Sequence, residues 1–400
     1  MMLNNPDSRF KEYDVNWSML PASDIFMVET DKGHPELPVL SASQEFGMVK
    51  RDNIGINMQY SKQNVASYKR VQPGRFVIHL RSFQGGFAHS AIEGITSPAY
   101  TVLSLKEPQK HDDYFWKYLF TSPEFIKRLE LVTYGIRDGR SISVEDFFEL
   151  PFCYPSTPEE QQEIAQFFSR LDTLIAAEDK KLAKLKNMKA ASLEKMFPKQ
   201  GETVPQVRFK GFSGEWSIGK LSDMAGYYRH SNENVHHQNL LSLSYGKIVR
   251  KNIKSKKGLL PASFDTYQVI KENIIVLRFT DLQNDHKSLR VGISKEEGII
   301  SPAYVCLECK DNIVPDYLYL LLHFYDLCKV FYSMGDGMRQ TLSYSDIKDL
   351  AIQIPNDPKE QEKIVSFFSR LDILISAQEL KICKLRSLKK SFLEKMFVSQ

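Results

Sequence analysis

A repeat that spans the whole chain constrains the fold more than any other feature of the sequence. Residues 155–175 return as residues 355–375, and both copies run on to Leu-Glu-Lys-Met-Phe, at 193–197 and 393–397. A period near 200 residues is far longer than the roughly 20 to 50 residues of a solenoid unit. The repeat therefore indicates whole domains that are duplicated within one chain.

The two copies match unevenly along their length. The segments that start at Pro155 and Pro355 agree closely, whereas the basic stretches before them agree only at scattered positions. A common frame therefore holds two different surfaces. Since single domains usually hold roughly 100 to 200 residues, we predict a first globular domain and its helix, then a second globular domain and its helix. The four segments are 1–154, 155–199, 200–354 and 355–400.

The shared segments have the pattern of long helices. Thr157 and Asp357 are placed as N-caps, each followed by a proline and, three residues after the cap, by Glu160 or Glu360; this is a strong helix-start signal. A helix over 159–197 would measure roughly 58 Å at 1.5 Å per residue. Apolar residues follow with four-three spacing, which predicts a packing seam: Ile164, Phe168, Leu171, Ile175, Leu182 and Leu185, and Ile364, Phe368, Leu371, Ile375, Ile382 and Leu385.

Such long helices need a partner, and the other copy is the obvious one. An antiparallel pair within one chain would place the two globular domains at opposite ends with approximate two-fold symmetry, as in proteins that read two DNA half-sites. A coiled coil that only joins two domains, or that dimerises with another chain, explains the periodicity equally well.

Short β-rich runs bounded by turn residues occur in both globular domains, at 74–80 and 273–279, and predict buried strands. Helical patterns follow at 113–120 and 316–323. The predicted fold class is therefore α+β: two tandem α/β domains joined and spaced by two long antiparallel coiled-coil helices, with a pseudo-two-fold internal repeat.

Composition excludes several classes of protein. No apolar run approaches the roughly 20 residues that span a bilayer, and the first residues lack the apolar stretch of a secretory signal, so we expect a cytoplasmic protein with no membrane partner. The five cysteines are scattered, which argues against a disulfide framework. Cys306 and Cys309 lack a second ligand pair, and His230, His236 and His237 lack a completing cysteine or acid. We expect no metal and no cofactor.

Basic residues concentrate in two stretches, although the net charge is only +4. Lysines and arginines number twelve against six acids over 220–291, and nine against four over 40–110. Such stretches could neutralise phosphates and release counterions. An ordinary solvated face is the alternative for each.

The motifs, present in duplicate and in order, resemble the specificity subunits of type I restriction-modification systems. The Pro-x-x-Pro-x-Glu-Gln-x-x-Ile starts and the Phe-Phe-x-x-Leu-Asp-x-Leu-Ile runs are similar to that family's conserved regions. The Ser-Pro-Ala-Tyr runs, the Gly135 and Gly335 segments and the stretch ending at Trp216 look like its target-recognition framework. One departure is residues 12–16, which replace the Gly-rich 211–215 of the second copy.

The resemblance implies two target-recognition domains, over 1–154 and 200–354, which read a bipartite sequence in double-stranded DNA at a spacing set by the helices. It implies two methylation subunits docked on those helices, which supply S-adenosylmethionine and methylate adenine. A restriction subunit would join them in the full complex. Under this hypothesis the chain is a non-catalytic DNA-binding subunit.

Missing motifs agree with a non-catalytic subunit. The sequence has no Gly-x-x-x-x-Gly-Lys-Ser/Thr loop for ATP, no Gly-x-Gly-x-x-Gly turn for a nucleotide cofactor and no Gly-x-Ser-x-Gly elbow. It also has no Asn/Asp-Pro-Pro-aromatic run of the kind that adenine methyltransferases use. A two-domain coiled-coil adaptor that binds only proteins is the alternative. It predicts binding that does not weaken steeply as salt rises.

Candidate DNA-reading residues are chosen by their hydrogen-bonding groups, because Arg matches guanine and Gln matches adenine in the major groove. A surface salt bridge or a turn is the alternative role for each. The base-reading candidates are Arg81, Ser82, Gln84, Arg137 and Arg140 in the first domain, and Arg278, Thr280, Gln283, Arg339 and Gln340 in the second. The phosphate candidates are Lys247, Arg250, Lys251 and Lys254, with Lys256 and Lys257.

Paired phenylalanines in each helix are candidates for the partner contact. One ring of each pair faces the seam, so its neighbour, about 100° around the helix, needs another cover. Either a methylation subunit or the chain's own globular domain would provide it. The pairs are Phe167 and Phe168, and Phe367 and Phe368.

Overall fold

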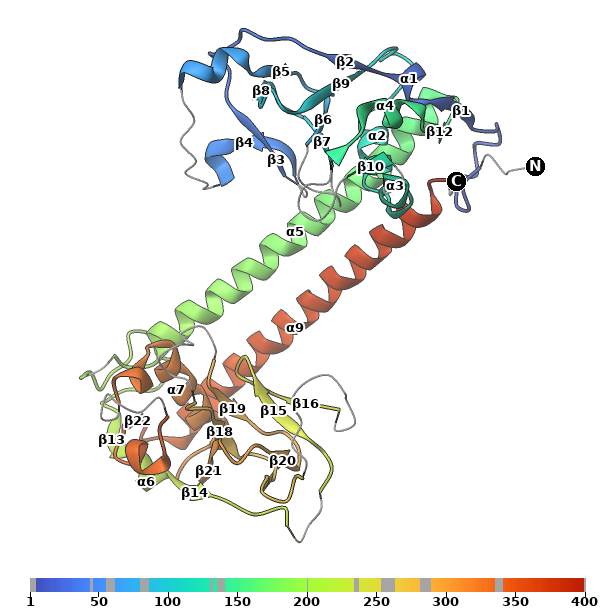
Figure 1. Ribbon diagram of the computed structural model, residues 1–400. Helices are drawn as coiled ribbons and strands as arrows, with labels where there is room; N and C mark the ends of the chain where they lie inside the picture. The colour runs from blue at the N-terminus through green and yellow to red at the C-terminus, as the bar shows by residue number, and fades with distance from the viewer. Residues whose placement is uncertain are drawn as a thin grey trace. The chain divides into compact units, whose positions relative to one another are not determined.

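Two long helices organise the chain. In the computed structural model, α5 covers Pro158–Met196 and α9 covers Pro358–Lys395, with 39 and 38 residues (Figure 1). Both agree closely with the predicted helices. The described residues are 5–43, 46–54, 62–79, 86–129, 132–134, 141–199, 201–233, 237–252, 263–280, 289–334 and 341–398.

The chain divides into two compact units. Unit 1 comprises Met1–Lys180 with Glu379–Gln400, and unit 2 comprises Lys181–Gln378. Each unit therefore holds one globular part, the beginning of one long helix and the end of the other. The units cut across both helices, whereas the four segments proposed from the sequence keep each helix whole.

The globular part of unit 1 is built on a four-stranded antiparallel sheet in the order β2-β9-β6-β7. The pairs β1-β12, β3-β4, β5-β8 and β10-β11 surround it. The strands are β1 Ser18–Pro21, β2 Phe26–Glu29, β3 Leu40–Ser43, β4 Gly47–Lys50, β5 Lys69–Val71, β6 Phe76–Ile78, β7 Phe87–His89, β8 Gly94–Thr96, β9 Thr101–Leu105, β10 Thr133–Tyr134, β11 Ser141–Ile142 and β12 Pro151–Tyr154. The helices are α1 Ala22–Ile25, α2 Asp113–Phe120, α3 Pro123–Leu129 and α4 Val144–Glu149, with 3-10 turns η1 Arg51–Ile54 and η2 Lys62–Ser67.

Unit 2 repeats this topology. Its four-stranded sheet has the order β14-β21-β18-β19, and the pairs β13-β22, β15-β16 and β17-β20 correspond to those of unit 1. The strands are β13 Ser217–Lys220, β14 Ala225–Tyr228, β15 Leu241–Ser244, β16 Lys247–Arg250, β17 Gln268–Ile270, β18 Ile275–Leu277, β19 Val291–Ile293, β20 Gly298–Ile300, β21 Val305–Cys309 and β22 Ala351–Ile354. The helices are α6 Leu221–Met224, α7 Pro315–Leu327 and α8 Tyr344–Ile347, with η5 Val330–Ser333. The predicted fold class and internal repeat are confirmed.

The two cores are filled differently. In unit 1 aromatic rings dominate: Phe26 lies 5.0 Å from Trp116 and 5.6 Å from Phe120, centroid to centroid. In unit 2 the corresponding sheet packs leucine and isoleucine, with Leu277 and Leu321 fully buried. Both fillings bury the inner face of the same sheet, which is the main source of stability for such a domain.

All five cysteines are free thiols. Cys306 and Cys309 lie on β21, where burial raises the pKa of each thiol to about 12. Within the described ranges, three or more His, Cys, Asp or Glu side chains do not gather into a group that could hold a metal; His236 lies outside these ranges. None of the described helices is long and apolar enough to cross a membrane.

Candidate nucleic-acid interface

A buried ion pair joins the start of each long helix to the beginning of its globular part. Glu160 accepts hydrogen bonds from Arg9 at 2.6 and 2.7 Å and from the indole of Trp17 at 3.1 Å. In unit 2, Arg208 donates to Glu360 at 2.7 and 2.8 Å. The hydrogen bonds, with the charge of the carboxylate, raise the pKa of Arg9 although burial lowers it.

This ion pair corrects the predicted role of the two glutamates. Their carboxylates bind arginine instead of capping the helix, because a buried carboxylate needs a charged partner. The N-cap prediction is confirmed at Asp357, which accepts from the Lys359 amide at 2.9 Å. It is wrong at Thr157, whose buried hydroxyl has no partner in the described residues.

The glutamine after each glutamate provides a second link. The side chain of Gln161 accepts from the Asp112 amide at 3.0 Å and donates to the Pro155 carbonyl at 2.9 Å. Gln361 likewise accepts from the Val314 amide at 3.1 Å. Each Glu-Gln pair therefore fixes the long helix to the start of α2 or α7. Sequence reasoning missed this role, although the duplicated Glu-Gln was visible.

Ion pairs join α5 to α9 within each unit, and in unit 1 they show the relative direction of the helices. In unit 1, Lys389 contacts Asp172 at 2.5 Å and Lys381 contacts Glu178 at 2.6 Å. The residue number on α9 falls as that on α5 rises, so the helices are antiparallel in this unit. In unit 2, Lys189 contacts Asp372 at 2.6 Å.

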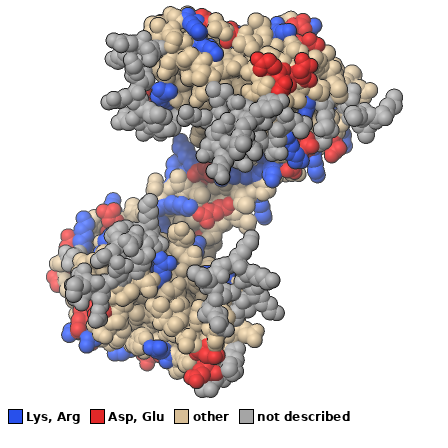
Figure 2. Space-filling model, in the orientation of Figure 1, with Lys and Arg blue, Asp and Glu red and all other residues tan. Residues whose placement is uncertain are grey.

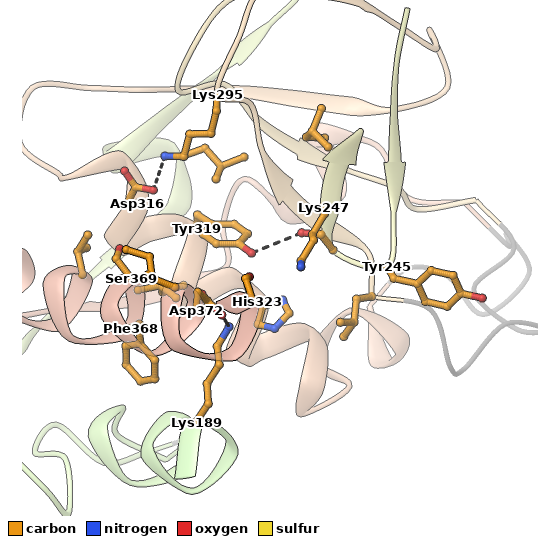
Figure 3. A pocket seen from close by; sticks show the side chains of 18 residues that line it. Lys189, Tyr245, Lys247, Lys295, Asp316, Tyr319, His323, Phe368, Ser369 and Asp372 are labelled. Carbon is orange, nitrogen blue, oxygen red and sulfur yellow. Dashed lines mark hydrogen bonds and ion pairs between the residues drawn. The ribbon is translucent and has the colours of Figure 1, made fainter. Parts of the chain in front are cut away.

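A groove of about 680 Å³ lies in unit 2 between the β15-β16 hairpin, α7 and α9 (Figure 3). Both of its acids are bonded to lysines, Asp372 to Lys189 and Asp316 to Lys295, each at 2.6 Å. Burial lowers the pKa of His323 to about 4, and Lys189 adds to this effect. His323 is therefore neutral at pH 7, and its Nδ1 has no partner in the described residues.

Lysine and arginine side chains line β16, next to this groove. Lys247 is exposed at the groove wall and makes no ion pair within the described part of the chain. Arg250 is held by Glu296, with its Nε 2.7 Å from the nearer carboxylate oxygen. Lys251 is exposed and follows the strand. Of the three, Lys247 and Lys251 therefore present ammonium groups that no acid in the described ranges neutralises, and such groups bind phosphates.

Charges of both signs are interspersed over the described surface of each unit on the face shown in Figure 2. This agrees with the small net charge of +4. Any DNA-binding face must therefore be defined by local groups such as those on β16, because net charge alone attracts a polyanion only weakly.

The chain matches the family described as the type I restriction modification DNA specificity domain over residues 15–187 and again over 214–384. The two matches cover most of the sequence. The chain belongs to this family. It is therefore a DNA specificity subunit, a non-catalytic component of the type I restriction-modification enzyme, as the motifs predicted.

Two solved structures share the fold of this specificity subunit. The S subunit of a type I restriction-modification system from M. genitalium has a TM-score of 0.56 at 15% identity, covering 99% of this chain and 100% of that chain. A structure described as the basis of complex assembly and conformational transition of the type I R-M system also has a TM-score of 0.56, at 14% identity, covering 95% and 97%. The search of curated protein sequences finds no match.

A buried arginine organises the end of β18, near two base-reading candidates of the specificity subunit. The Nη1 of Arg290 donates to the carbonyls of Arg278 at 3.1 Å and Thr280 at 2.7 Å, and its Nε donates to Tyr332 at 3.0 Å. Arg278 and Thr280 are both half-buried. Sequence reasoning missed Arg290, because nothing in a sequence distinguishes a buried arginine from a solvated one.

The remaining DNA-reading candidates lie outside the described residues, and their roles stay predictions. They are Arg81, Ser82, Gln84, Arg137, Arg140, Lys254, Gln283, Arg339 and Gln340. The phosphate candidates Lys256 and Lys257 lie outside them as well.

The paired phenylalanines divide between two environments. Phe168 and Phe368 are fully buried in the cores of units 1 and 2. Phe167 is half-buried, with its ring 6.1 Å from Phe10 and 4.9 Å from Phe392. Phe367 lies 6.0 Å from Phe209. The chain's own residues thus cover much of each pair, and the exposed edges of Phe167 and Phe367 are what a partner could still touch.

Proposed function

We propose that this specificity subunit reads a bipartite duplex DNA sequence, one half with each globular part, and directs adenine methylation and restriction by partner subunits. The observation that carries the proposal is the double family match, over residues 15–187 and 214–384. One DNA-specificity domain per half of the chain supports one half-site per domain.

The two units share their links to the long helices but differ in their hairpins, which supports one half-site per unit. The links at Glu160 and Glu360 use the same residue types and nearly the same distances. The two hairpins differ in sequence. The second residue of β4 is Met48, whereas the first two residues of β16 are Lys247 and Ile248. The matching links at Glu160 and Glu360 attach each globular part to its long helix in the same way. The differing surfaces of the two globular parts select different bases.

Exposed apolar side chains on the long helices support docking of two methylation subunits. Leu174 of α5 and Leu374 of α9 occupy equivalent positions and are both exposed, as are Met188 and Leu388. Exposed apolar residues at matched positions are typical of protein-binding sites. A similar structure concerns assembly of a type I R-M system, and we infer that this chain assembles with methylation and restriction subunits.

The test is methylation by the purified chain mixed with its methylation subunits, read by sequencing modified bases in treated DNA. We expect modified adenines at one split sequence. Replacing residues 1–154 by those of another specificity subunit should change one half-site only, and replacing residues 200–354 should change the other.

Two results would contradict the proposal. A stable complex that methylates without sequence preference would indicate a protein-binding adaptor. A change in both half-sites after one replacement would show that the two globular parts do not read independently.

A further inference from the structure

The tips of two equivalent hairpins carry exposed aromatic rings. Phe46 lies between β3 and β4 in unit 1, and Tyr245 lies between β15 and β16 in unit 2. Their exposed fractions are 70% and 76%, the two largest among the large hydrophobic side chains of the described residues. Two units with divergent surfaces therefore each expose an aromatic ring directly before a glycine in the corresponding hairpin.

The turn that carries Tyr245 favours other residue types. Tyr245 and Gly246 have φ of 46° and 75°, the left-handed pair of a two-residue type I′ hairpin turn. Asn, Asp or Gly is usual at the first position, and a bulky residue there is uncommon. The backbone conformation does not favour a tyrosine at this position, so we infer that the side chain itself has a function.

The glycine that follows each ring packs closely against the rest of its unit. A Cβ on Gly47 would lie 2.3 Å from the His89 carbonyl oxygen, so the backbone at this tip rests directly on β7. A Cβ on Gly246 would lie 3.2 Å from the Leu289 Cβ, and the Tyr319 hydroxyl donates to the Gly246 carbonyl at 3.4 Å. The backbone next to each ring therefore packs against the rest of its unit.

The surroundings of Tyr245 favour nucleic acid over protein as its partner. Its neighbours Ser244 and Lys247 are exposed and polar, whereas protein interfaces bury an apolar core. The ring points away from Lys189 and Asp372 of the groove (Figure 3). A flat ring beside an exposed lysine is the combination that binds unstacked bases and their phosphates.

We propose that Phe46 and Tyr245 contact duplex DNA directly, each by stacking on a base of the half-site that its own unit reads. This proposal rests on the proposed function. Enzymes that modify a base within a duplex take it out of the stack, and an apolar side chain that enters a base step reduces the cost of unstacking. An aromatic ring does so with little loss of conformational entropy, because only two side-chain torsions are ordered.

The experiment uses the specificity subunit assembled with its methylation subunits and a duplex that carries the sequence assigned by modified-base sequencing. 2-Aminopurine, placed at successive positions, increases in fluorescence where it loses a stacked neighbour, as it does next to a base that has left the stack, whereas a 2-aminopurine stacked on the ring itself stays quenched. We expect Tyr245→Ala to weaken binding roughly tenfold, the order of magnitude for losing one base–aromatic stack. The fluorescence increase should disappear in the half-site of unit 2 alone, and Phe46→Ala should act only on the half-site of unit 1.

Two matched variants serve as controls. Tyr245→Phe keeps the ring and should behave as the wild type. Tyr227→Ala removes another exposed tyrosine of unit 2, one that stacks on Tyr344 at 5.7 Å, and should leave binding and fluorescence unchanged.

Several outcomes would overturn the inference. Wild-type binding and fluorescence in both alanine variants would show that the rings do not touch DNA. Loss of assembly with the methylation subunits in the absence of DNA would identify the rings as protein contacts. The proposed function fails separately, when the wild-type complex itself methylates no specific sequence.

Discussion

Unit 1 surrounds its helix-joining glutamate more completely than unit 2 does. Glu160 accepts from Arg9 and from the indole of Trp17, whereas Glu360 accepts from Arg208 and the buried indole nitrogen of Trp216 has no partner among the described residues. Sequence identity at these positions is complete, but the hydrogen bonding differs. The duplicated motif therefore keeps the charge pair in both units and the indole hydrogen bond in unit 1.

The cores and helix flanks differ more deeply. Unit 1 packs Phe26 and Trp116 where unit 2 packs aliphatic side chains. Beside the long helices, unit 1 places Tyr118, whose hydroxyl donates to Asp172 at 2.9 Å, and unit 2 places the neutral His323. One backbone frame accepts both fillings, because cores tolerate exchange of hydrophobic residues when the overall pattern is kept.

The largest expected loss of stability comes from removing Glu160 or Glu360, the buried acids that pair with arginine at the start of each long helix. Glu360→Ala should lower the free energy of unfolding of unit 2 by about 3 kcal/mol, because it leaves a largely buried arginine without its counter-charge. Glu160→Ala should cost unit 1 about 4 kcal/mol, since the indole of Trp17 also loses its acceptor. Hydrogen–deuterium exchange on the full chain measures the two units separately.

Two glutamine variants provide the control for this comparison. Glu160→Gln keeps an acceptor for Trp17 and should recover part of the loss, whereas Glu360→Gln has no indole bond to preserve. Equal losses at both positions, for both substitutions, would show that the extra hydrogen bond of unit 1 contributes nothing to stability.

The next largest expected effect is a loss of stability of unit 2 at acidic pH. Burial lowers the pKa of His323 from 6.5 to about 4, so the unfolded chain binds a proton at a pH where the folded unit does not. Unit 2 should therefore lose stability as pH falls from 6.5 towards 4, by roughly 2 kcal/mol. His323→Gln should remove this part of the pH dependence in unit 2, measured by exchange at each pH.

Unit 1 is the internal reference for this titration. Helix α2 has no histidine in its sequence, and His323→Gln should leave the pH dependence of unit 1 unchanged. If unit 2 keeps the same acid profile after the substitution, then other groups cause it, and the burial of His323 has no thermodynamic consequence.

The sequence was sufficient for features that depend on local pattern. The repeat, the helix-start prolines and the apolar spacing predicted α5 and α9 closely, because cap chemistry and side-chain period are written in consecutive residues. The strands around Phe76 and Ile275 were predicted as well, although both are shorter in the structure.

Features that depend on distant residues were not predictable in this way. The glutamates looked like helix caps, and their partners lie 151 and 152 residues away. The buried role of Arg290 likewise exists only once β18 and β19 are paired. The recurrence of Arg9 and Arg208 ahead of the two glutamates was the available signal. It identified a shared frame without saying which side chains meet.

The smallest expected effect concerns the lysines that link the two long helices. Lys389→Met should lower the free energy of unfolding of unit 1 by about 1 kcal/mol, and Lys189→Met should lower that of unit 2 by under about 0.5 kcal/mol. Lys389 lies 5.5 Å from the ring of Tyr118 and shares Asp172 with its hydroxyl, whereas Asp372 is half exposed. Methionine keeps the packing of the lysine stem, so the loss reports the charge. A double-mutant cycle with Asp172→Asn isolates the pair; a coupling no larger than that of Lys189 with Asp372 would mean that Tyr118 does not strengthen the link.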